Sequence, residues 1–292
     1  MDTGSPSSWV MGADCTSTAC TTHTTFGDKD SNTLKITQEP FTIQYGTGAV
    51  EGVVISDTMQ LADMSLRISF GSATKVSDHF INNPIDGIIG LGRAKSNSMG
   101  VPIFMDVVGG AKVLPAKLFG FSLQRASDGT NDGEINFGSP DTTKYTGRLS
   151  FTDTVSDQVQ WEIPIEDAIV NGVPCKLTGN TAIIDTGTSY MLLPPDDAKV
   201  LHAQIPNSQS AGASYHIPCS TTVSIEVVFS KVAYSISPKD YIGAPIQGGN
   251  LCQSQIIGYL TGGPDQWLLG DTFMKNVYTV FDMDNARIGK LN

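Results

Sequence analysis

The chain has 292 residues, which is too long for one typical compact core and suits two lobes of about 150 residues each. Hydrophobic residues make up 40% of it and charged residues only 16%, so the composition excludes a disordered protein. The 29 acidic residues outnumber the 18 basic ones for a net charge of -11, and such a surface repels phosphate backbones. Nucleic acid is therefore not an expected partner.

Short apolar stretches separated by Gly, Ser and Thr dominate the chain. Residues 41–45 alternate apolar and polar side chains, Gly46-Thr47-Gly48 follows, and residues 50–55 are again rich in apolar side chains. This order predicts a β-hairpin over 41–55 with a flexible, glycine-rich tip.

Helical signals are few. Segments that begin with proline predict helices over 102–108 and 195–204, and a third helix is expected over 271–276. Alternation predicts a strand over 221–227 and part of one over 235–238. Many short strands with few helices predict a mainly β fold.

The sequence holds no apolar run near the ~18–20 residues of a membrane span, so no membrane partner is expected. It also holds no signal peptide, although a mature chain would lack one too.

Five cysteines limit the disulfide possibilities. Cys15 and Cys20 could close a very short loop, Cys219 and Cys252 could close a longer one, and Cys175 is left over. The alternative is five free buried thiols. We favour two disulfides and, with them, a secreted or vacuolar protein.

An internal repeat gives the strongest signal. Asp2-Thr3-Gly4-Ser5 recurs as Asp185-Thr186-Gly187-Thr188. At nearly the same distance downstream, the first copy is followed by Ile88-Ile89-Gly90 and the second by Leu268-Leu269-Gly270. The repeat predicts a duplicated lobe.

We therefore expect a bilobal fold with two β-barrel-like lobes related by a pseudo-two-fold axis. The N-terminal lobe is expected over residues 1–143 and the C-terminal lobe over 144–292.

The residue types of the repeat indicate paired carboxylates. Glycine after Asp-Thr allows a tight turn that presents backbone N–H groups to the carboxylate. The hydroxyls of Ser5 and Thr188 could each donate to the neighbouring carboxylate, and the apolar residues 182–184 should form a buried strand that leads into Asp185. Symmetry would bring Asp2 and Asp185 face to face. The alternative is two ordinary Asp-Gly turns.

Two carboxylates at close range cannot both ionise, so they share one proton. The ionised partner can activate a water as general base, while the protonated partner donates to a scissile carbonyl oxygen. This chemistry needs no metal and no cofactor, and we expect neither.

The sequence resembles the pepsin-like aspartic peptidases, and among them secreted fungal members. These peptidases are the standard example of a shared-proton carboxylate pair. The resemblance runs nearly end to end, through both Asp-Thr-Gly motifs and the segments Tyr45-Gly46-Thr47-Gly48, Asp86-Gly87-Ile88-Ile89-Gly90-Leu91-Gly92 and Leu268-Leu269-Gly270-Asp271.

The resemblance implies a role for each site residue. Asp2 and Asp185 would be catalytic, and Tyr45 would lie on a flap that closes over substrate. Substrate would contact Gly4, Ser5, Tyr45, Gly46, Thr47, Gly187 and Thr188. Thr3 and Thr186 would interlock beneath the dyad, and Trp9 would hold the Tyr45 hydroxyl. The implied disulfides are Cys15–Cys20 and Cys219–Cys252. By itself, Tyr45 fits a half-buried strand residue and Trp9 a core residue.

The chain departs from this family at its start. About thirty residues, including the strand that leads into the first Asp, precede the motif in the family, and here only Met1 does. A shortened N-terminus is therefore expected, and a frayed Asp2 would leave this chain weakly active or inactive. Adding the missing strand should raise turnover of a protein substrate at acid pH.

The expected function is an aspartic endopeptidase that works at acid pH as a monomer and is inhibited by pepstatin-type compounds. Because Thr47 carries no charge, bulky hydrophobic residues are expected beside the cleaved bond. The alternatives are an inactive or binding-only pepsin-fold protein and a glycosidase with paired carboxylates.

Overall fold

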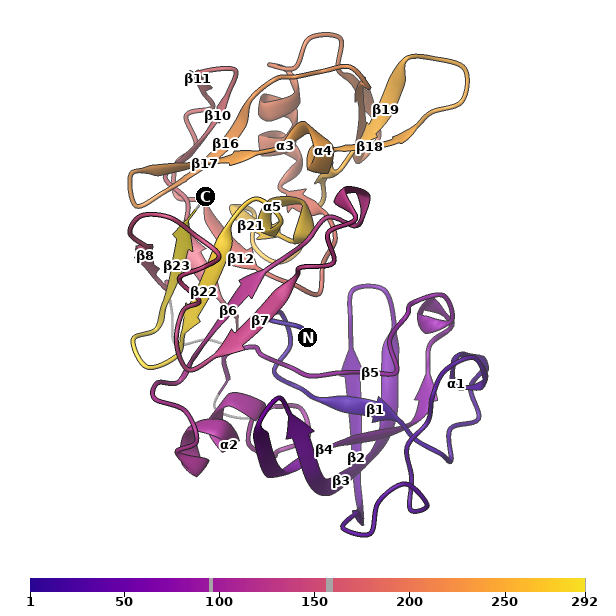
Figure 1. The fold of residues 1–292 in the computed structure, drawn as a ribbon. Coiled ribbons are helices and arrows are strands. Elements are labelled where there is room, and N and C mark those ends of the chain that lie inside the picture. The colour runs from indigo at the N-terminus through magenta and orange to yellow at the C-terminus, as the bar shows by residue number, and fades with distance from the viewer. Residues whose placement is uncertain (95–96, 156–159, 292) are drawn as a thin grey trace. The chain divides into compact units, whose positions relative to one another are not determined.

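A computed structural model describes residues 1–94, 97–155 and 160–291. The chain divides into two compact units, Met1–Pro115 and Ala116–Asn292. Both are built mainly from strands, which confirms the predicted mainly β fold class (Figure 1). The lobe boundary expected between residues 143 and 144 refers to the two duplicated halves of the sequence, not to these compact units, and it stays a prediction.

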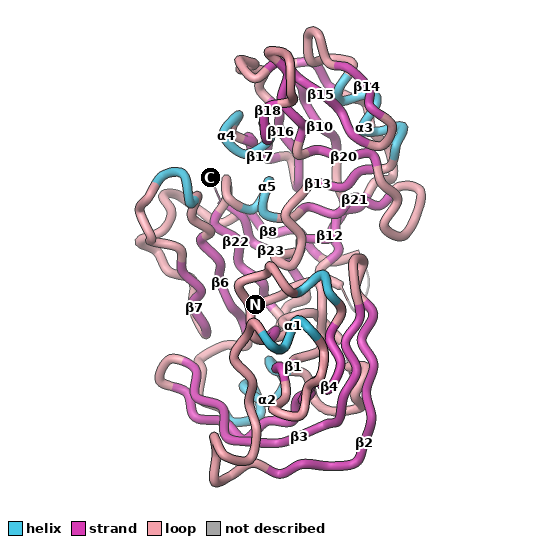
Figure 2. Tube along the Cα trace, turned by 90° about the vertical axis from the view of Figure 1, so that its right-hand side faces the viewer, coloured by secondary structure: helices cyan, strands magenta, loops and turns pink. Residues whose placement is uncertain are grey.

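The first unit contains one five-stranded sheet with the order β2-β3-β4-β1-β5. Its strands are β1 (Trp9–Met11), β2 (Lys35–Gln44), β3 (Ala49–Leu61), β4 (Met64–Val76) and β5 (Gly87–Ile88). The long strands β2, β3 and β4 lie side by side in Figure 2.

The expected hairpin over 41–55 is present, because β2 and β3 pair antiparallel up to Gln44 and Ala49. The core beside it gathers Trp9, Phe41, Val50 and Phe80, all of which are buried. Burial of these side chains stabilises the unit.

The helices of the first unit are short. They are α1 (Thr18–Thr21) and α2 (Phe104–Ala111), with a 3₁₀ turn over Asp78–Phe80. The helix expected over 102–108 begins two residues later, because Ile103 is extended, and it ends where Lys112 takes a left-handed conformation at φ 54.

The described residues of the second unit form four sheets. One has the order β20-β13-β21-β12-β9 and leads to the second motif copy. Its strands are β9 (Glu162–Pro164), β12 (Thr181–Ile184), β13 (Met191–Leu193), β20 (Ile256–Gly258) and β21 (Gln266–Leu269). The buried strand expected over 182–184 is thus present as β12.

Another sheet has the order β7-β6-β22-β23-β8 and combines early and late parts of the chain. Its strands are β6 (Leu118–Ser122), β7 (Glu134–Phe137), β8 (Ser150–Asp153), β22 (Tyr278–Asp282) and β23 (Arg287–Leu291). Because β6 pairs with β22, the chain after residue 115 packs with the C-terminal strands.

Two four-stranded sheets complete the second unit, in the orders β11-β10-β16-β17 and β14-β15-β19-β18. The first contains β10 (Asp167–Val170), β11 (Val173–Pro174), β16 (Ile225–Phe229) and β17 (Val232–Ile236). The second contains β14 (Gln209–Ala211), β15 (Ser214–Pro218), β18 (Ile242–Pro245) and β19 (Leu251–Ser254).

The helices of the second unit are α3 (Pro195–His202), α4 (Pro238–Tyr241) and α5 (Asp271–Met274), with a 3₁₀ turn over Ala126–Asp128. The helices expected over 195–204 and 271–276 are therefore present, each two residues shorter at its end.

The strand expected over 221–227 was wrong at its start. β16 begins only at Ile225, because the preceding residues turn: the N–H of Thr221 donates to Pro218, and Thr221 Oγ1 accepts from the N–H of Val223. The segment 235–238 was expected to be a strand in part. Strand β17 ends at Ile236, and helix α4 begins at Pro238.

Both expected disulfides are present, Cys15–Cys20 and Cys219–Cys252. Cys175 is a free, half-buried thiol, and burial raises its pKa to about 11. Such a thiol is a poor nucleophile. Among the described residues, helices long and apolar enough to cross a membrane are absent.

Two basic side chains are buried in the second unit. His202 stacks on Tyr215 at 3.8 Å and contacts Ala198 O and Ser254 Oγ, and burial lowers its pKa to about 4. Lys290 Nζ lies 4.3 Å from the centre of the Phe229 ring, without a hydrogen-bond partner in the described ranges. Burial lowers the pKa of Lys290 to about 7.

Replacing Lys290 by Met should stabilise the chain. The folded-state pKa of about 7 lies below the unfolded value, so the contribution of Lys290 to stability falls as the pH drops from about 10.5 to 7 and stays low below that. We expect Lys290→Met to raise the free energy of unfolding by about 2–4 kcal/mol at pH 6 and by less than about 1 kcal/mol at pH 10.

Denaturant unfolding at both pH values measures this difference. The exposed Lys199 gives the control, Lys199→Met, which should change stability little at either pH. A stability gain for Lys290→Met that is equal at pH 6 and pH 10 would contradict the titration argument.

Candidate active site

The first motif copy is tied to the residues that follow β5. The N–H of Asp2 donates to Ile89 O at 3.0 Å, and the N–H of Leu91 donates to Asp2 O at 2.8 Å. The N–H of Gly4 donates to Asp2 Oδ1 at 2.9 Å, which is the turn that the sequence predicted. The Asp2 side chain is thus buried and held by backbone.

The second motif copy follows β12 and repeats this geometry. The N–H of Asp185 donates to Leu269 O at 3.0 Å, and the N–H of Gly187 donates to Asp185 Oδ1 at 2.8 Å. Thr188 Oγ1 donates to Asp185 Oδ2 at 2.7 Å, as expected from the sequence. The Asp185 carboxylate is thus held by one backbone donor and one hydroxyl donor.

Glycine is required where each loop meets the neighbouring strand. A Cβ on Gly90 would lie 2.6 Å from Ser7 N, and a Cβ on Gly270 would lie 2.0 Å from Thr188 O. Both downstream glycines of the repeat therefore permit close approach of two backbones.

The hydroxyl of Ser5 has different neighbours from that of Thr188. Ser5 Oγ accepts from the N–H of Ser7 at 3.3 Å. Burial raises the pKa of Tyr45, and a hydrogen bond with the Ser5 side chain opposes a small part of that rise. Donation from Ser5 to Asp2 stays a prediction.

Tyr45 lies beside the first motif copy. Trp9 Nε1 donates to Tyr45 Oη at 2.7 Å, and the Tyr45 ring packs edge-on to Phe80. Burial raises the pKa of Tyr45 to about 12, the hydrogen bond from Trp9 lowers it, and the charge of Asp2 raises it. Tyr45 is therefore neutral at acid and neutral pH, and Asp2 lies near it.

The tip of the β2–β3 hairpin projects beyond Tyr45. The N–H of Tyr45 donates to Gly48 O at 2.7 Å, which closes the tip, and both Gly46 and Thr47 are exposed. No heavy atom would lie within 4 Å of a Cβ on Gly46. Gly46 therefore lies in open space at the tip.

The remaining predicted site residues lie within the two loops. Thr3 is fully buried, whereas Thr186 is half-buried and Gly187 is exposed. The structure thus gathers Asp2, Thr3, Gly4, Ser5, Trp9 and Tyr45 in the first unit and Asp185, Thr186, Gly187 and Thr188 in the second. The interlocking of the two threonines stays a prediction.

Asp271 was not predicted as a site residue. Burial raises its pKa, Lys275 lowers it, and the charge of Asp185 raises it further. The available signal was its position directly after Leu268-Leu269-Gly270, because that segment supports the second motif copy. Within the described ranges, clusters of His, Cys, Asp and Glu suited to a metal ion are absent.

A duplicated Asp-Thr-Gly loop on a mainly β fold is the arrangement of the aspartyl protease class. The eukaryotic aspartyl protease family matches residues 1–290. The chain belongs to this family, and the predicted resemblance is confirmed.

Named relatives agree with this family. The probable aspartic-type endopeptidase CTSD of Arthroderma otae is 47% identical over 289 residues, which cover 99% of this chain and 76% of that protein. The aspartic-type endopeptidase ctsD of Aspergillus fumigatus is 47% identical over 294 residues, which cover 100% of this chain and 62% of that protein. Gastricsin of Cavia porcellus is 33% identical over 299 residues, which cover 99% of this chain and 74% of that protein. The predicted assignment to the aspartic endopeptidases is thus confirmed at the level of the enzyme class.

Replacing Gly270 by Ala should disrupt the second loop. The added methyl group would overlap Thr188 O, so either β21 or the Asp185 loop must move. We expect the free energy of unfolding to fall by about 2–4 kcal/mol. Gly263 gives a matched control in the same unit, because a Cβ there would meet its nearest neighbour at 3.9 Å. Equal stability of Gly270→Ala and Gly263→Ala, measured by denaturant unfolding, would show that close approach is not a constraint.

Proposed function

We propose that this protein is an aspartic endopeptidase that hydrolyses peptide bonds at acid pH with Asp2 and Asp185 as its catalytic pair. The observation that carries the proposal is the repeated loop geometry. Each aspartate accepts a hydrogen bond from the glycine two residues later and donates its own N–H to the neighbouring segment. Such repetition is what a symmetric two-carboxylate site requires.

The proposed reaction follows from proton sharing. Two close carboxylates hold one proton between them, so one is ionised and one is neutral. The ionised carboxylate removes a proton from a water, whose oxygen attacks the carbonyl carbon, while the neutral carboxyl donates its proton to the carbonyl oxygen. Collapse of the tetrahedral intermediate then breaks the C–N bond: the amine takes the proton that the first carboxylate removed from water, and a hydroxyl of the intermediate returns its proton to the second carboxylate.

Neighbouring groups support action at acid pH. Burial and the charge of Asp185 both raise the pKa of Asp271, so acid keeps Asp271 neutral. When the pH rises and Asp271 ionises, a second negative charge is placed beside Asp185. Tyr45 keeps its proton throughout this range and can donate a hydrogen bond from the hairpin.

Substituting either catalytic aspartate should abolish hydrolysis. Asp2→Asn and Asp185→Asn each remove the ability to exchange the shared proton, so we expect the rate of cleavage of denatured haemoglobin at pH 3–4 to fall by about 10²–10⁴-fold. Asp63→Asn, in an exposed turn, is the control and should keep full activity.

Pepstatin binding separates this proposal from its alternative. A transition-state mimic should bind the unchanged chain tightly at acid pH and should bind Asp185→Asn weakly. A chain that neither cleaves protein nor binds pepstatin would instead support an inactive or binding-only protein.

Thr47 should set part of the substrate preference. An uncharged hairpin tip offers no partner for a lysine ammonium, so we expect bulky hydrophobic residues beside the cleaved bond to be favoured over Lys by at least about 10-fold in kcat/KM. Thr47→Asp should raise cleavage after Lys, and Thr47→Asn, which has a similar shape without the charge, should not. Efficient cleavage after Lys by the unchanged chain in a peptide library would count against this assignment.

The two disulfides support an oxidising location, so we propose a secreted or vacuolar protein that acts as a monomer.

A further inference from the structure

The loop of Asp185 is bonded to the first residues of α5. The N–H of Asp271 donates to Thr188 O at 2.8 Å, and the N–H of Thr272 donates to Ser189 O at 3.0 Å. Thr272 Oγ1 also donates to Ser189 O, at 2.9 Å, and Thr272 is buried. Because the hydroxyl of Thr188 donates to the Asp185 carboxylate, a shift of α5 would move a group that holds Asp185.

The other end of α5 is held by the side chain of Asn276. Asn276 Nδ2 donates to Thr272 O at 3.0 Å and to Phe273 O at 3.4 Å. The last carbonyls of a helix lack donors within the helix, so a side chain that supplies them fixes the helix end. Thr272 is thus bonded to Ser189 through its N–H and hydroxyl and to Asn276 through its carbonyl.

The orientation of the Asn276 amide is set by Arg125, which directly precedes the 3₁₀ turn Ala126–Asp128. Arg125 Nη2 donates to Asn276 Oδ1 at 2.9 Å, and the N–H of Ser237 donates to the same oxygen at 2.9 Å. An amide has one accepting oxygen and one donating nitrogen. Two donors on Oδ1 therefore direct Nδ2 toward α5.

Arg125 is itself held by Asp240 of α4. Arg125 Nε donates to both carboxylate oxygens of Asp240 at 2.9 Å, and Nη2 donates to Oδ2 at 2.7 Å. The Asp240 side chain is 4% exposed and that of Arg125 22% exposed, so water screens this pair less than a surface pair. A planar guanidinium can serve Asp240 and Asn276 at once, whereas a lysine ammonium lacks this fork.

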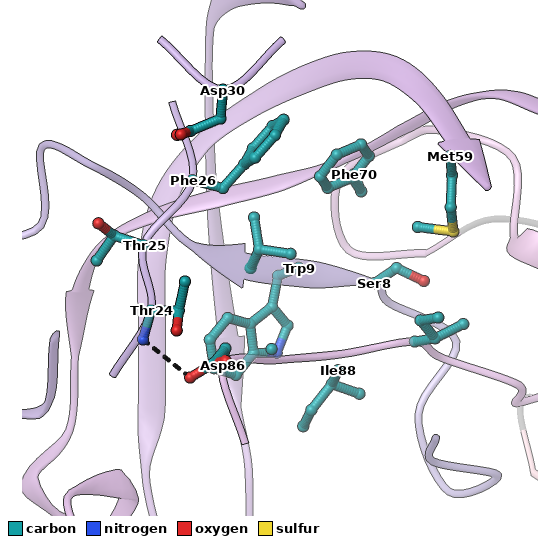
Figure 3. A pocket seen from close by; sticks show the side chains of 13 residues that line it. Ser8, Trp9, Thr24, Thr25, Phe26, Asp30, Met59, Phe70, Asp86 and Ile88 are labelled. Carbon is teal, nitrogen blue, oxygen red and sulfur yellow. Dashed lines mark hydrogen bonds between the residues drawn. The ribbon is translucent and has the colours of Figure 1, made fainter. Parts of the chain in front are cut away.

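The segment that holds Asp2 in the first unit has different surroundings. Residues 87–89, which precede Gly90, line an apolar pocket of about 480 Å³ together with Trp9 (Figure 3). Figure 3 marks a hydrogen bond there from the N–H of Thr24 to Asp86 Oδ1, which is 3.0 Å long. The charged arrangement around α5 lies in the second unit, so its effect is expected on Asp185.

We propose that Arg125 is a positioning residue for Asp185 that acts through Asn276 and α5. The guanidinium orients the Asn276 amide, the amide fixes the end of α5, and α5 fixes the backbone of Thr188 and Ser189. The proposal rests on the proposed function, because it takes Asp185 as catalytic. A catalytic group must be held within about 0.5 Å of its productive position, so loosening α5 should slow the reaction.

Two substitutions break this path at different points. Asn276→Ala removes the contact with α5 and leaves the pair of Arg125 and Asp240 in place, and Arg125→Gln removes the guanidinium. Each should lower kcat for a peptide substrate at pH 3–4 by about 10-fold or more, with KM changed by less than about threefold. The double variant should lose no more than the worse single variant, because both act on one path. Arg125→Lys, which keeps the charge beside Asp240, should retain more activity than Arg125→Gln.

Arg287→Gln is the matched control. Arg287 Nε donates to Asp282 Oδ2 at 2.8 Å in the same unit, and the Asp282 side chain is 6% exposed. This variant also loses an ion pair with a buried carboxylate, so denaturant unfolding should show a comparable loss of stability, yet kcat should stay within about twofold. Amide hydrogen exchange in residues 271–273 should become faster in Asn276→Ala and Arg125→Gln and stay unchanged in Arg287→Gln.

Three results would overturn the proposal. One is Asn276→Ala with unchanged kcat and unchanged exchange at 271–273. Another is a double variant whose losses add, because Arg125 would then act by another route. The third is an equal loss of kcat in Arg287→Gln, because lower stability alone would then explain it.

The exchange measurement separates this proposal from the proposed function. An unchanged chain without peptidase activity would defeat the proposed function, and faster exchange at 271–273 in the Asn276 and Arg125 variants would still support the link to α5. Equal exchange in all variants would defeat the link. Should Arg125→Gln fail to fold, Arg125→Lys takes its place in the double variant and in the exchange comparison.

Discussion

The contact between each Asp-Thr-Gly loop and a glycine on the neighbouring segment is the constraint on which the site depends. The position of a carboxylate in a tight turn is fixed only if the backbone of the turn is fixed. Here the N–H groups of Asp2 and Asp185 fix it by donating to the carbonyl oxygens of Ile89 and Leu269. They can form only because Gly90 and Gly270 lack side chains. The segment that follows β5 or β21 and carries each glycine thus fixes the position of an aspartate that is far away in sequence.

Two buried basic side chains work against stability in acid. Burial lowers the folded-state pKa of His202 to about 4 and that of Lys290 to about 7, so acid must protonate each of them inside the core. For both groups the folded-state pKa lies below the unfolded one, so acid favours the unfolded chain, through His202 as the pH falls from about 6.5 to 4 and through Lys290 already at neutral pH. A protein proposed to work at acid pH therefore carries two buried bases whose unfavourable contribution its core must offset.

The local sequence pattern predicted helices and strands correctly where residues close in sequence determine the secondary structure. The hairpin over 41–55 followed from alternation and a glycine-rich tip, and α3 followed from Pro195 and early acidic residues. The pattern failed at 221–224, where alternation also fits a strand but hydrogen bonds to Pro218 and Thr221 form a turn. Asp271 was missed although it directly follows Leu268-Leu269-Gly270, because that position does not show that its carboxyl is buried near Asp185.

The sequence by itself determined the class of protein, since a repeated pair of motifs at matched spacing is visible without coordinates and predicts a duplicated two-carboxylate site. It also determined the turn that each aspartate makes, because Gly at the third position permits the N–H of that residue to reach the carboxylate. Only the tertiary structure decided which groups surround these aspartates: the indole of Trp9 on Tyr45 and the carboxyl of Asp271, whose pKa burial raises. Those features arise from residues far apart along the chain, and burial and hydrogen-bond geometry exist only after the strands have packed.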